Sequence, residues 1–331
     1  MQTWRFTLKP LSAFATPLMG DTLFGQLCWT VRHLAGEERL TELLSTYTEG
    51  SPFCVLSDGF PTGHIPRPHL PIFSMSSSED SNAQDRKAGK KKMWMSVDDC
   101  LKPVSEWLSF CKSADELYGT DYDKLKEEAR MHNSINRMTG TTGESGFAPF
   151  AVTQQWYRPD TLLDVHVVIN PARFSIDEME DALKYIGSGG YGKDASTGRG
   201  QFTVERKSSH DPYAHSNSDA WLTLSPCAPQ GLGFNEDKSY WQLFTRFGRH
   251  GSLAAVGGQP FKNPVLLARA GSVFTPQEFS QVHFIGQGLG GNGELSKSIT
   301  GTVHQGYAPV IGLHLVDVHQ RIAESCSWEI V

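Results

Sequence analysis

A glycine-rich segment spans residues 187–200 and reads Gly-Ser-Gly-Gly-Tyr-Gly-Lys-Asp-Ala-Ser-Thr-Gly-Arg-Gly. Glycine permits positive φ angles and lets another backbone approach closely. Concave loops rich in amide groups bind anions, and cations and hydroxyls add phosphate contacts. The segment therefore indicates backbone or phosphate binding, with an ordinary flexible connection as the alternative. The candidate contacts are Gly189, Gly190, Lys193, Ser196, Thr197 and Arg199.

The same segment contains the spacing Gly-x-x-x-x-Gly-Lys, which begins an ATP-binding P-loop. In a P-loop the next residue is a Ser or Thr that holds Mg²⁺, whereas here it is Asp194, whose charge would lie beside the phosphates. A P-loop also follows a strand and opens a helix, and this loop follows a helical pattern and precedes a strand. We therefore do not predict nucleotide hydrolysis.

Histidine is the other residue type that could do chemistry, because it can act as a general acid or base. Twelve histidines are present, and no sequence feature brings two of them together. The candidates are His64, His69, His132 and His304. The six cysteines lie far apart, without the close pairs that zinc sites or redox motifs require, so we interpret them as buried thiols. The sequence predicts neither a metal site nor a cofactor.

Composition limits the kind of RNA contact that the chain can make. The 331 residues are 39% hydrophobic, enough for one large core or two of ordinary size. A net charge of −6 argues against a broad basic face, so RNA contact must be local. No apolar run approaches the roughly 20 residues of a membrane span, and a secretion signal is not evident, so we expect a cytoplasmic protein.

The elements that must position these residues follow from the hydrophobic pattern. Residues 3–9 alternate as in a half-buried strand, which Pro10 ends. A helix capped by Gly20 or Asp21 follows, then a second helix at 37–47 and a strand at 53–56 that stops at Ser-Asp-Gly. Inward-facing positions of the first helix recur at helical spacing: Leu23, Phe24, Leu27, Val31 and Leu34.

A polar stretch and a hairpin are expected next. Residues 75–92 have almost nothing to bury, which predicts a mobile loop, and helical pieces are expected at 97–110 and 121–131. Two alternating segments, 147–157 and 161–169, flank an Arg-Pro-Asp turn and predict a hairpin.

The second helix of this half should begin at Ser175. Glu178 stands three residues later, as in a capping box, and the helix runs straight into the glycine-rich segment. Met179, Leu183 and Ile186 should face inward. A strand at 201–206 follows.

This order of elements is that of a ferredoxin-like or RRM-like unit, whose open sheet face suits single-stranded RNA. A polar stretch at 208–219 then leads to strand candidates at 221–224, 241–247, 264–274 and 308–318, with a second glycine loop at 286–293. The predicted class is α+β with two ferredoxin-like units, the first carrying helical and hairpin insertions. We predict an N-terminal domain at 1–207 with an insertion at about 74–146, and a β-rich, diverged C-terminal domain at 208–331.

Four parts of the chain resemble the RAMP superfamily of CRISPR proteins, and within it the foot subunit of type III-A (Csm) complexes. The first joins residues 8–18 to the Gly-Asp-Thr-Leu-Phe-Gly-Gln-Leu-Cys-Trp of 20–29, and the second joins Ser-Asp-Gly-Phe-Pro at 57–61 to Pro-Arg-Pro at 66–68. The third begins His-Asn-Ser-Ile-Asn-Arg at 132–137 and runs to 143, and the fourth is the glycine-rich segment, the hallmark of the superfamily.

The resemblance implies a non-catalytic subunit that binds the 5′ tag of the guide RNA (crRNA). It also implies contact with a large polymerase-like subunit and with backbone RAMP subunits, and only indirect contact with target RNA. A short tag in a narrow cleft presents few phosphates, so few cations suffice. Beside the glycine-rich segment, the implied RNA contacts are His132, Asn133 and Arg137, with Arg67, Gly288, Gly290 and Gly291 as further candidates.

Two alternatives remain open from the sequence. Some RAMP relatives cut precursor crRNA without metal, using His as general acid or base, so the chain can also be read as such an endoribonuclease. A purely structural subunit that contacts only proteins is the second alternative. For Arg67, between two prolines, a structural salt bridge is as good an interpretation as an RNA contact.

Overall fold

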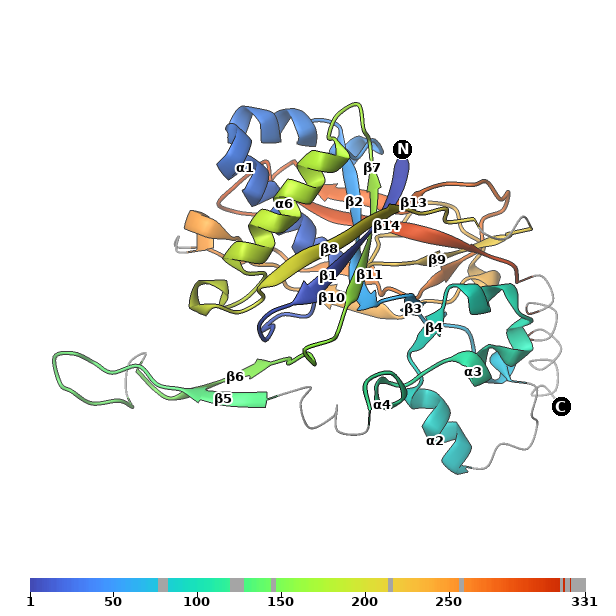
Figure 1. The fold of residues 1–331 in the computed structure, drawn as a ribbon. Helices are drawn as coiled ribbons and strands as arrows, with labels where there is room; N and C mark the ends of the chain where they lie inside the picture. Colours follow the sequence, from blue (N-terminus) through green and yellow to red (C-terminus); the bar gives the residue numbers. More distant parts are fainter. Residues whose placement is uncertain are drawn as a thin grey trace.

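The computed structural model describes residues 1–76, 83–119, 128–143, 147–213, 217–255 and 259–315, together with 318 and 322 (Figure 1). Its first half runs strand, helix, strand, strand, helix, strand around an insertion, which confirms the predicted order. These elements are β1 (Gln2–Pro10), α1 (Gly20–Leu44), β2 (Cys54–Pro61), β7 (Leu163–Ile169), α6 (Ile176–Gly189) and β8 (Phe202–Ser209). The strands form one antiparallel sheet in the order β2-β7-β1-β8.

Helix α1 merges the two helices that the sequence predicted. Gly36 has φ 90° and ψ 170°, so the helix kinks there and continues to Leu44. A short 3-10 turn, η1 (Tyr47–Glu49), follows it. The expected cap was wrong, because Met19 is the N-cap residue and caps with no side-chain bond, whereas Gly20 and Asp21 are buried in the first turn. The capping box of α6 is confirmed in both directions between Ser175 and Glu178.

Strand β2 passes through the sequence that was expected to stop it. Its pairing with β7 shifts between Leu56 and Gly59, a β-bulge. The hydroxyl of Ser57 accepts a hydrogen bond from the amide of His166 at 2.7 Å there. The side chain therefore replaces a ladder bond, and the strand resumes until Pro61.

The predicted hairpin between 147–157 and 161–169 was wrong. Strand β6 (Phe150–Gln154) pairs instead with β5 (Glu128–His132), and the resulting β5–β6 hairpin extends away from the body (Figure 1). All seven residues of β7 are buried, so this strand belongs at the centre of the sheet, between β1 and β2.

The insertion is more ordered than its composition indicated. Within the stretch expected to be a mobile loop, residues 83–91 form a helix, while 77–82 lie outside the described residues. Of the helix expected at 121–131, residues 121–127 lie outside the described part and the rest is strand β5. The elements are β3 (His64–Pro66), η2 (Ile72–Met75), α2 (Ala83–Lys91), β4 (Trp94–Ser96), η3 (Asp98–Leu101), η4 (Val104–Glu106), α3 (Trp107–Phe110) and α4 (Ala114–Tyr118).

The second half is built from strands. One sheet has the order β12-β9-β14-β13, and a separate two-stranded ribbon pairs β10 with β11. The bounds are β9 (Ala220–Thr223), β10 (Leu243–Arg246), β11 (Val265–Ala268), β12 (Val273–Phe274), β13 (Phe284–Gly290) and β14 (Val303–Leu313). In residues 217–255 and 259–315 the only helical elements are the short 3-10 turns η6 (Glu236–Lys238) and η7 (Ser252–Ala255).

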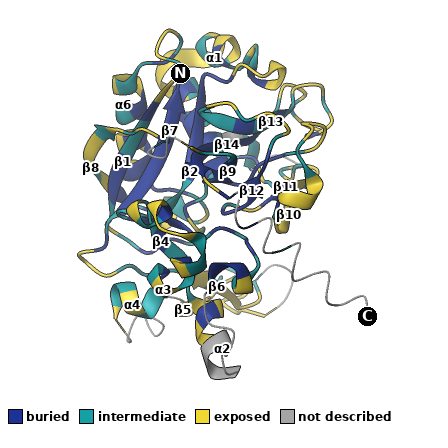
Figure 2. Ribbon diagram, turned by 90° about the vertical axis from the view of Figure 1, so that its right-hand side faces the viewer, coloured by how far each residue is buried: buried dark blue, intermediate teal, exposed yellow. Residues whose placement is uncertain are grey.

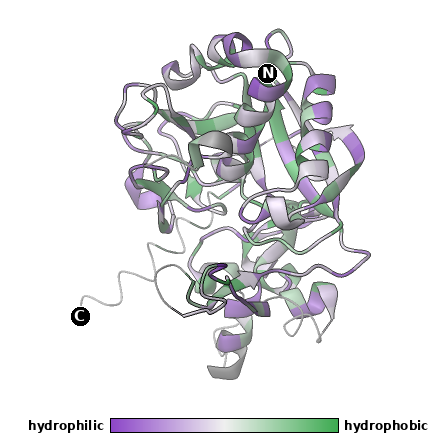
Figure 3. Cartoon of the chain, turned by 90° about the vertical axis from the view of Figure 1, so that its left-hand side faces the viewer, coloured by the Kyte–Doolittle hydropathy of each residue, from purple (hydrophilic) through white to green (hydrophobic). Residues whose placement is uncertain are grey.

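The two halves share a core around β14 (Figure 2). Tyr307 is 1% exposed and belongs to the cluster between the first sheet and its helices, where its hydroxyl donates to the carbonyl of Tyr47 at 2.7 Å. The buried Gln305 side-chain amide bonds both the N–H and the C=O of Leu56, at 2.9 and 2.7 Å. Hydrophobic residues concentrate on the strands of the body (Figure 3). None of the helices in the described ranges is long and apolar enough to cross a membrane.

Candidate nucleic-acid interface

Helix α1 holds the glycine-rich loop in one conformation. Helix α6 ends at Gly189, and the next residue, Gly190, has φ 94°. The Gln26 side chain from α1 donates to the carbonyl of Gly190 at 2.9 Å and accepts from the amide of Gly192 at 3.0 Å. Tyr191 is fully buried, and its hydroxyl donates to the Pro17 carbonyl and accepts from the Met19 amide. The loop is therefore a fixed structure, not a flexible connection.

The end of the loop is tied to the segment that follows β1. Gly200 donates its amide to Ala13 and accepts from the amide of Tyr191, at 2.9 Å each. Its φ is 70°, and a Cβ there would collide with the backbone of Tyr191, so only glycine fits. The amide of Lys193 donates to the Thr16 hydroxyl at 3.0 Å. Two loops thus form one surface.

Most predicted side chains of the loop face solvent on this surface. Lys193, Ser196 and Thr197 are exposed, and Arg199 is half-buried. The Thr197 hydroxyl donates to the carbonyl of Asp194 at 2.8 Å, so it stabilises the turn as well. Gly189 is exposed and Gly190 is buried. The surface therefore offers cations and a hydroxyl beside a rigid backbone, which suits a phosphate.

A tryptophan joins this loop to the β5–β6 hairpin. The guanidinium of Arg199 lies 5.8 Å from the ring centre of Trp156, and that of Arg130, in β5, lies 5.6 Å from it. The indole N–H donates to Glu128 at 2.9 Å. Such contacts between a cation and an aromatic ring are favourable. Arg130 is also paired with Glu128, at 3.1 Å. Sequence reasoning missed Trp156 and Arg130, because their proximity to Arg199 depends on the three-dimensional fold.

The hairpin carries the other predicted RNA contacts. The ring of His132 stacks on Phe150 with centroids 5.6 Å apart, and Asn133 and Arg137 are exposed in the segment beyond β5. Met138, in the turn at its tip, is 96% exposed. The structure thus brings the three predicted residues together on the hairpin, away from the loop surface (Figure 1).

The remaining candidates lie elsewhere. Arg67 is half-buried and donates to the carbonyl of Gly89 at 2.7 Å, and it forms no salt bridge within the described ranges. A Cβ on Gly288 would press on Tyr47, and one on Gly290 would press on Thr302 and Leu295.

Gly291 also has a positive φ, of 81°. Packing and backbone geometry therefore already account for these glycines, and RNA contact by them stays a prediction.

A buried ion pair lies beneath the loop. Both oxygens of Asp21 accept from the Arg246 guanidinium, in a bidentate pair between α1 and β10, and His304 Nε2 lies 3.4 Å from Asp21. Burial raises the pKa of Asp21, but the bonds and charges of His304 and Arg246 outweigh it and hold that pKa well below its ordinary value. Arg246 also reaches the sulfur of Met19 at 3.2 Å. The cluster fixes the start of α1, on which the loop rests.

A second carboxyl group beside this cluster, that of Asp58, has a raised pKa instead of a lowered one. Asp58 accepts from the amide of Gly20 at 2.8 Å, and burial raises its pKa from 3.8 to about 8. A raised pKa favours the protonated acid in the folded state, so its contribution to stability is full below pH 3.8 and is lost as the pH rises through about 8. Asp58→Asn, which keeps the acceptor, should flatten the fall in stability between pH 4 and 8. Urea unfolding at several pH values measures this, and an unchanged slope contradicts it.

The structure brings two unpredicted histidines together. The rings of His166 and His210 lie 4.9 Å apart, on the face of the sheet that also carries the buried Asp164. His166 is 2% exposed, and burial and the neighbouring charges lower the pKa of both rings. Because the His166 ring is covered, it cannot act together with His210 on an RNA backbone, so the pair does not favour the endoribonuclease interpretation.

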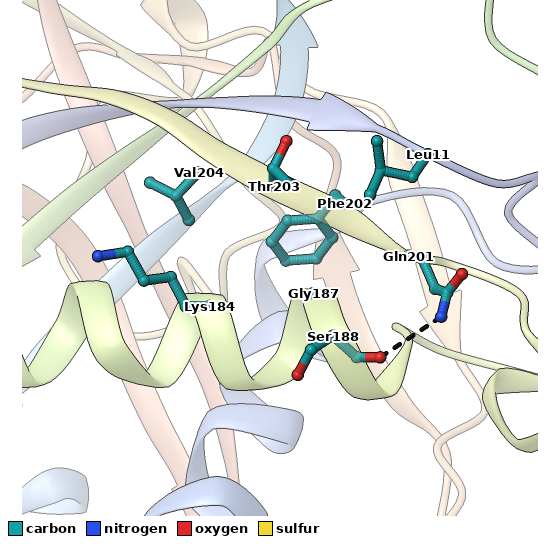
Figure 4. Close-up of a pocket in the computed structure, with 8 residues that line it drawn as sticks. All are labelled: Leu11, Lys184, Gly187, Ser188, Gln201, Phe202, Thr203 and Val204. Atoms are coloured by element: carbon teal, nitrogen blue, oxygen red, sulfur yellow. Dashed lines mark hydrogen bonds between the residues drawn. The ribbon is translucent and has the colours of Figure 1, made fainter.

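The hollow between α6 and β8 is lined mainly by apolar atoms (Figure 4). It has a volume of about 360 Å³, and at one end Gln201 donates to the carbonyl of Ser188 at 3.4 Å. A Cβ on Gly187 would collide with Phe202, so the helix and strand are in close contact there. Within the described residues no three His, Cys, Asp or Glu side chains gather into a metal-binding group.

The fold and the loop surface together define an α+β protein with a fixed, glycine-rich loop suited to phosphates. Neither a family model nor the sequence of a curated protein matches the chain. Solved structures do match. A chain of the Csm1-Csm4 cassette in complex with pppApA has a TM-score of 0.58 and 14% identity, over 95% of this chain and 98% of that chain.

A chain of the Csm3-Csm4 subcomplex in the type III-A CRISPR-Cas interference complex has a TM-score of 0.60 and 14% identity, over 95% of this chain and 100% of that one. A further Csm1-Csm4 cassette, in complex with cA4, matches with a TM-score of 0.58 at 14% identity, over 94% and 98% of the two chains. Csm4 is the component that these structures have in common. Over about 95% of its length the chain is therefore similar in fold to chains of these assemblies.

Proposed function

We propose that the chain is a RAMP-type, non-catalytic subunit of a type III CRISPR interference complex. Within that class it corresponds to Csm4 of a type III-A complex, binds the 5′ tag of the crRNA, and joins the large polymerase-like subunit to the backbone subunits. The match over about 95% of the chain to structures of both a Csm1-Csm4 and a Csm3-Csm4 assembly carries this proposal. The fixed glycine-rich loop supports it independently of the comparisons.

The proposal includes the domain plan. We infer two ferredoxin-like units, 1–207 with the insertion at about 74–146, and 208–331 as a diverged unit in which strands replace most of the helical layer. The first sheet supports this inference, since its order β2-β7-β1-β8 is that of a β-α-β-β-α-β unit. We place the subunit in the cytoplasm with its RNA.

RNA contact should combine the loop surface and the hairpin. Arg199 and Lys193 supply cations near the fixed amides, while His132, Asn133 and Arg137 offer an aromatic ring and hydrogen-bonding groups to unstacked bases. Few phosphates are contacted, so the net charge of −6 is no obstacle.

The test removes one cation from each surface. In a reconstituted complex, Arg137→Gln with Arg199→Gln should lower retention of tagged crRNA by about 10-fold, because two charge-assisted contacts are lost. The matched control, Arg32→Gln with Lys184→Gln, removes two charges from exposed ion pairs on other surfaces and should bind as the wild type. Filter binding measures how much tagged crRNA each double variant retains. Equal retention in both double variants supports the purely structural subunit instead.

A further inference from the structure

A second set of cations begins where the loop surface meets the β10–β11 ribbon. Phe244 of β10 has two guanidinium groups near its ring, with that of Arg246 at 5.1 Å and that of Arg269 at 4.8 Å from the ring centre. Arg246 is committed to Asp21, and its side chain is 17% exposed. Arg269 is exposed and makes no ion pair within the described ranges. Asp21 therefore neutralises the charge of Arg246, whereas Arg269 has no carboxylate partner among the described residues.

The turn after Arg269 leads to the segment that carries Arg67. The amide of His69 donates to the carbonyl of Gly271 at 2.8 Å, and the Ser272 hydroxyl lies 3.4 Å from His69 Nδ1. That hydroxyl also donates to the carbonyl of Arg269 at 2.6 Å. His69 thus lies between the two arginines. Burial first, and then the charges of Arg67 and Arg269, lower its pKa to about 4, so at neutral pH it is an uncharged hydrogen-bonding group.

No acid of the described residues balances these arginines. Arg67 bonds only a backbone carbonyl, and the carboxyl group that Arg269 affects, Asp58, has its pKa raised to about 8 by burial. A half-buried guanidinium without a counter-charge is unfavourable unless a ligand supplies one. A bound anion would supply that counter-charge.

We propose that Arg67, His69 and Arg269 form a phosphodiester-binding subsite for single-stranded RNA, with Phe244 positioning Arg269. This inference rests on the proposed function, since the RNA would continue from the glycine-rich loop. The loop adjoins this ribbon, because Tyr191 bonds the amide of Met19 and Arg246 bonds both Met19 and Asp21. The tag would then cross the start of α1 from one set of cations to the next.

RNA fits the subsite by charge and by shape. Arginine binds phosphate through paired N–H groups, and its planar face stacks on an unstacked base when an aromatic ring supports the other face. Arg269 over Phe244 meets that condition, and the His69 ring can donate or accept a single bond to a 2′-hydroxyl. A protein partner with an acidic surface is the competing occupant, and the experiment separates the two.

The test uses the reconstituted complex with a guide that carries the tag and a guide that lacks it. For the tagged guide, Arg67→Gln with Arg269→Gln should reduce the slope of log affinity against log salt by about 1.4, at about 0.7 for each lost phosphate contact. For the guide without the tag, the double variant and the wild type should have the same slope. With the tagged guide, Phe244→Leu should reduce the slope by less than the double variant does. The control, Arg32→Gln with Lys184→Gln, should leave the slope unchanged.

Each other outcome overturns the subsite. Wild-type slopes in the Arg67 and Arg269 double variant refute it, while a loss in the Arg137 and Arg199 variant would leave the proposed function standing. Loss of a protein subunit with the RNA retained, seen by native mass spectrometry, assigns the surface to a protein instead. The thermal midpoint of each purified variant identifies misfolding. If the Arg67 and Arg269 double variant misfolds, the single variant Arg269→Lys replaces it. Lysine keeps the charge but lacks the paired N–H groups of the guanidinium, so this variant should still weaken binding.

Discussion

Replacing Asp21 with Asn is expected to lower the free energy of unfolding by about 3–5 kcal/mol, the usual result of removing one partner of a buried ion pair. The Asp21 side chain is fully buried and the Arg246 side chain is 17% exposed, so the variant leaves a guanidinium without its counter-charge. Urea unfolding followed by tryptophan fluorescence measures this loss. The pair should also impose a pH dependence, since the lowered pKa of Asp21 gives stability that is present above its ordinary pKa and lost as the pH falls.

The control for this prediction is an exposed pair of the same chemistry. Arg32 and Glu37 lie 2.8 Å apart, with side chains 38% and 71% exposed, so Glu37→Gln should cost at most about 1 kcal/mol. Replacing both buried partners, as Asp21→Leu with Arg246→Met, should recover much of the stability lost in Asp21→Asn, because no guanidinium is then left without its counter-charge. Equal losses in Asp21→Asn and Glu37→Gln would contradict the role given to the buried pair.

Local signals predicted the parts of the fold that local physics decides. The capping box of Ser175 and Glu178, the strand β1 and the inward positions of α1 up to Val31 each depend on neighbours within one element. Leu34, the last position expected to face inward, is wrong: it is 59% exposed, two residues before the kink at Gly36. The glycine-rich loop was also recognisable, since positive φ angles at Gly190 and Gly200 require that residue type.

The sequence did not show which strands and side chains pair with one another in the fold. The segment at 161–169 could pair with either neighbour by its pattern, and its all-buried character, which places it at the sheet centre, emerges only once helices cover the sheet. The same limit hid the pair of Asp21 and Arg246, which are 225 positions apart. Asp21 therefore received the role of helix cap, although its side chain serves β10.

The predicted site was divided by the fold for a related reason. Sequence reasoning grouped the hairpin residues with the glycine-rich loop, but the structure puts Trp156, with Arg130 and Arg199 near its ring, at the junction. A tryptophan followed by Tyr-Arg-Pro gives no signal for RNA on its own. Trp156 contacts Arg130 and Arg199 only because the fold places it at the base of the hairpin.

Gly200→Ala should be the most damaging single change to the RNA-binding surface. A Cβ at this position would lie 2.6 Å from the amide nitrogen of Tyr191 and closer still to its carbonyl oxygen, so the loop must open and lose its bonds to Ala13 and Tyr191. We expect a loss of about 2–5 kcal/mol in stability, from about 1–2 kcal/mol of backbone strain and about 1–3 kcal/mol of overpacking. Retention of tagged crRNA should fall by at least about 10-fold in the reconstituted complex.

Gly198→Ala separates backbone strain from overpacking, because Gly198 also has a positive φ but has room for a Cβ. Gly198 has φ 83°, close to the 70° of Gly200, but a Cβ there would meet nothing within 4 Å. It should therefore lose only the strain of about 1–2 kcal/mol and keep its RNA. If both variants released the crRNA equally, flexibility of the glycines would be what the RNA requires. If only Gly200→Ala did so, the close contact with Tyr191 holds the amides and cations in place, and the RNA recognises a preformed surface.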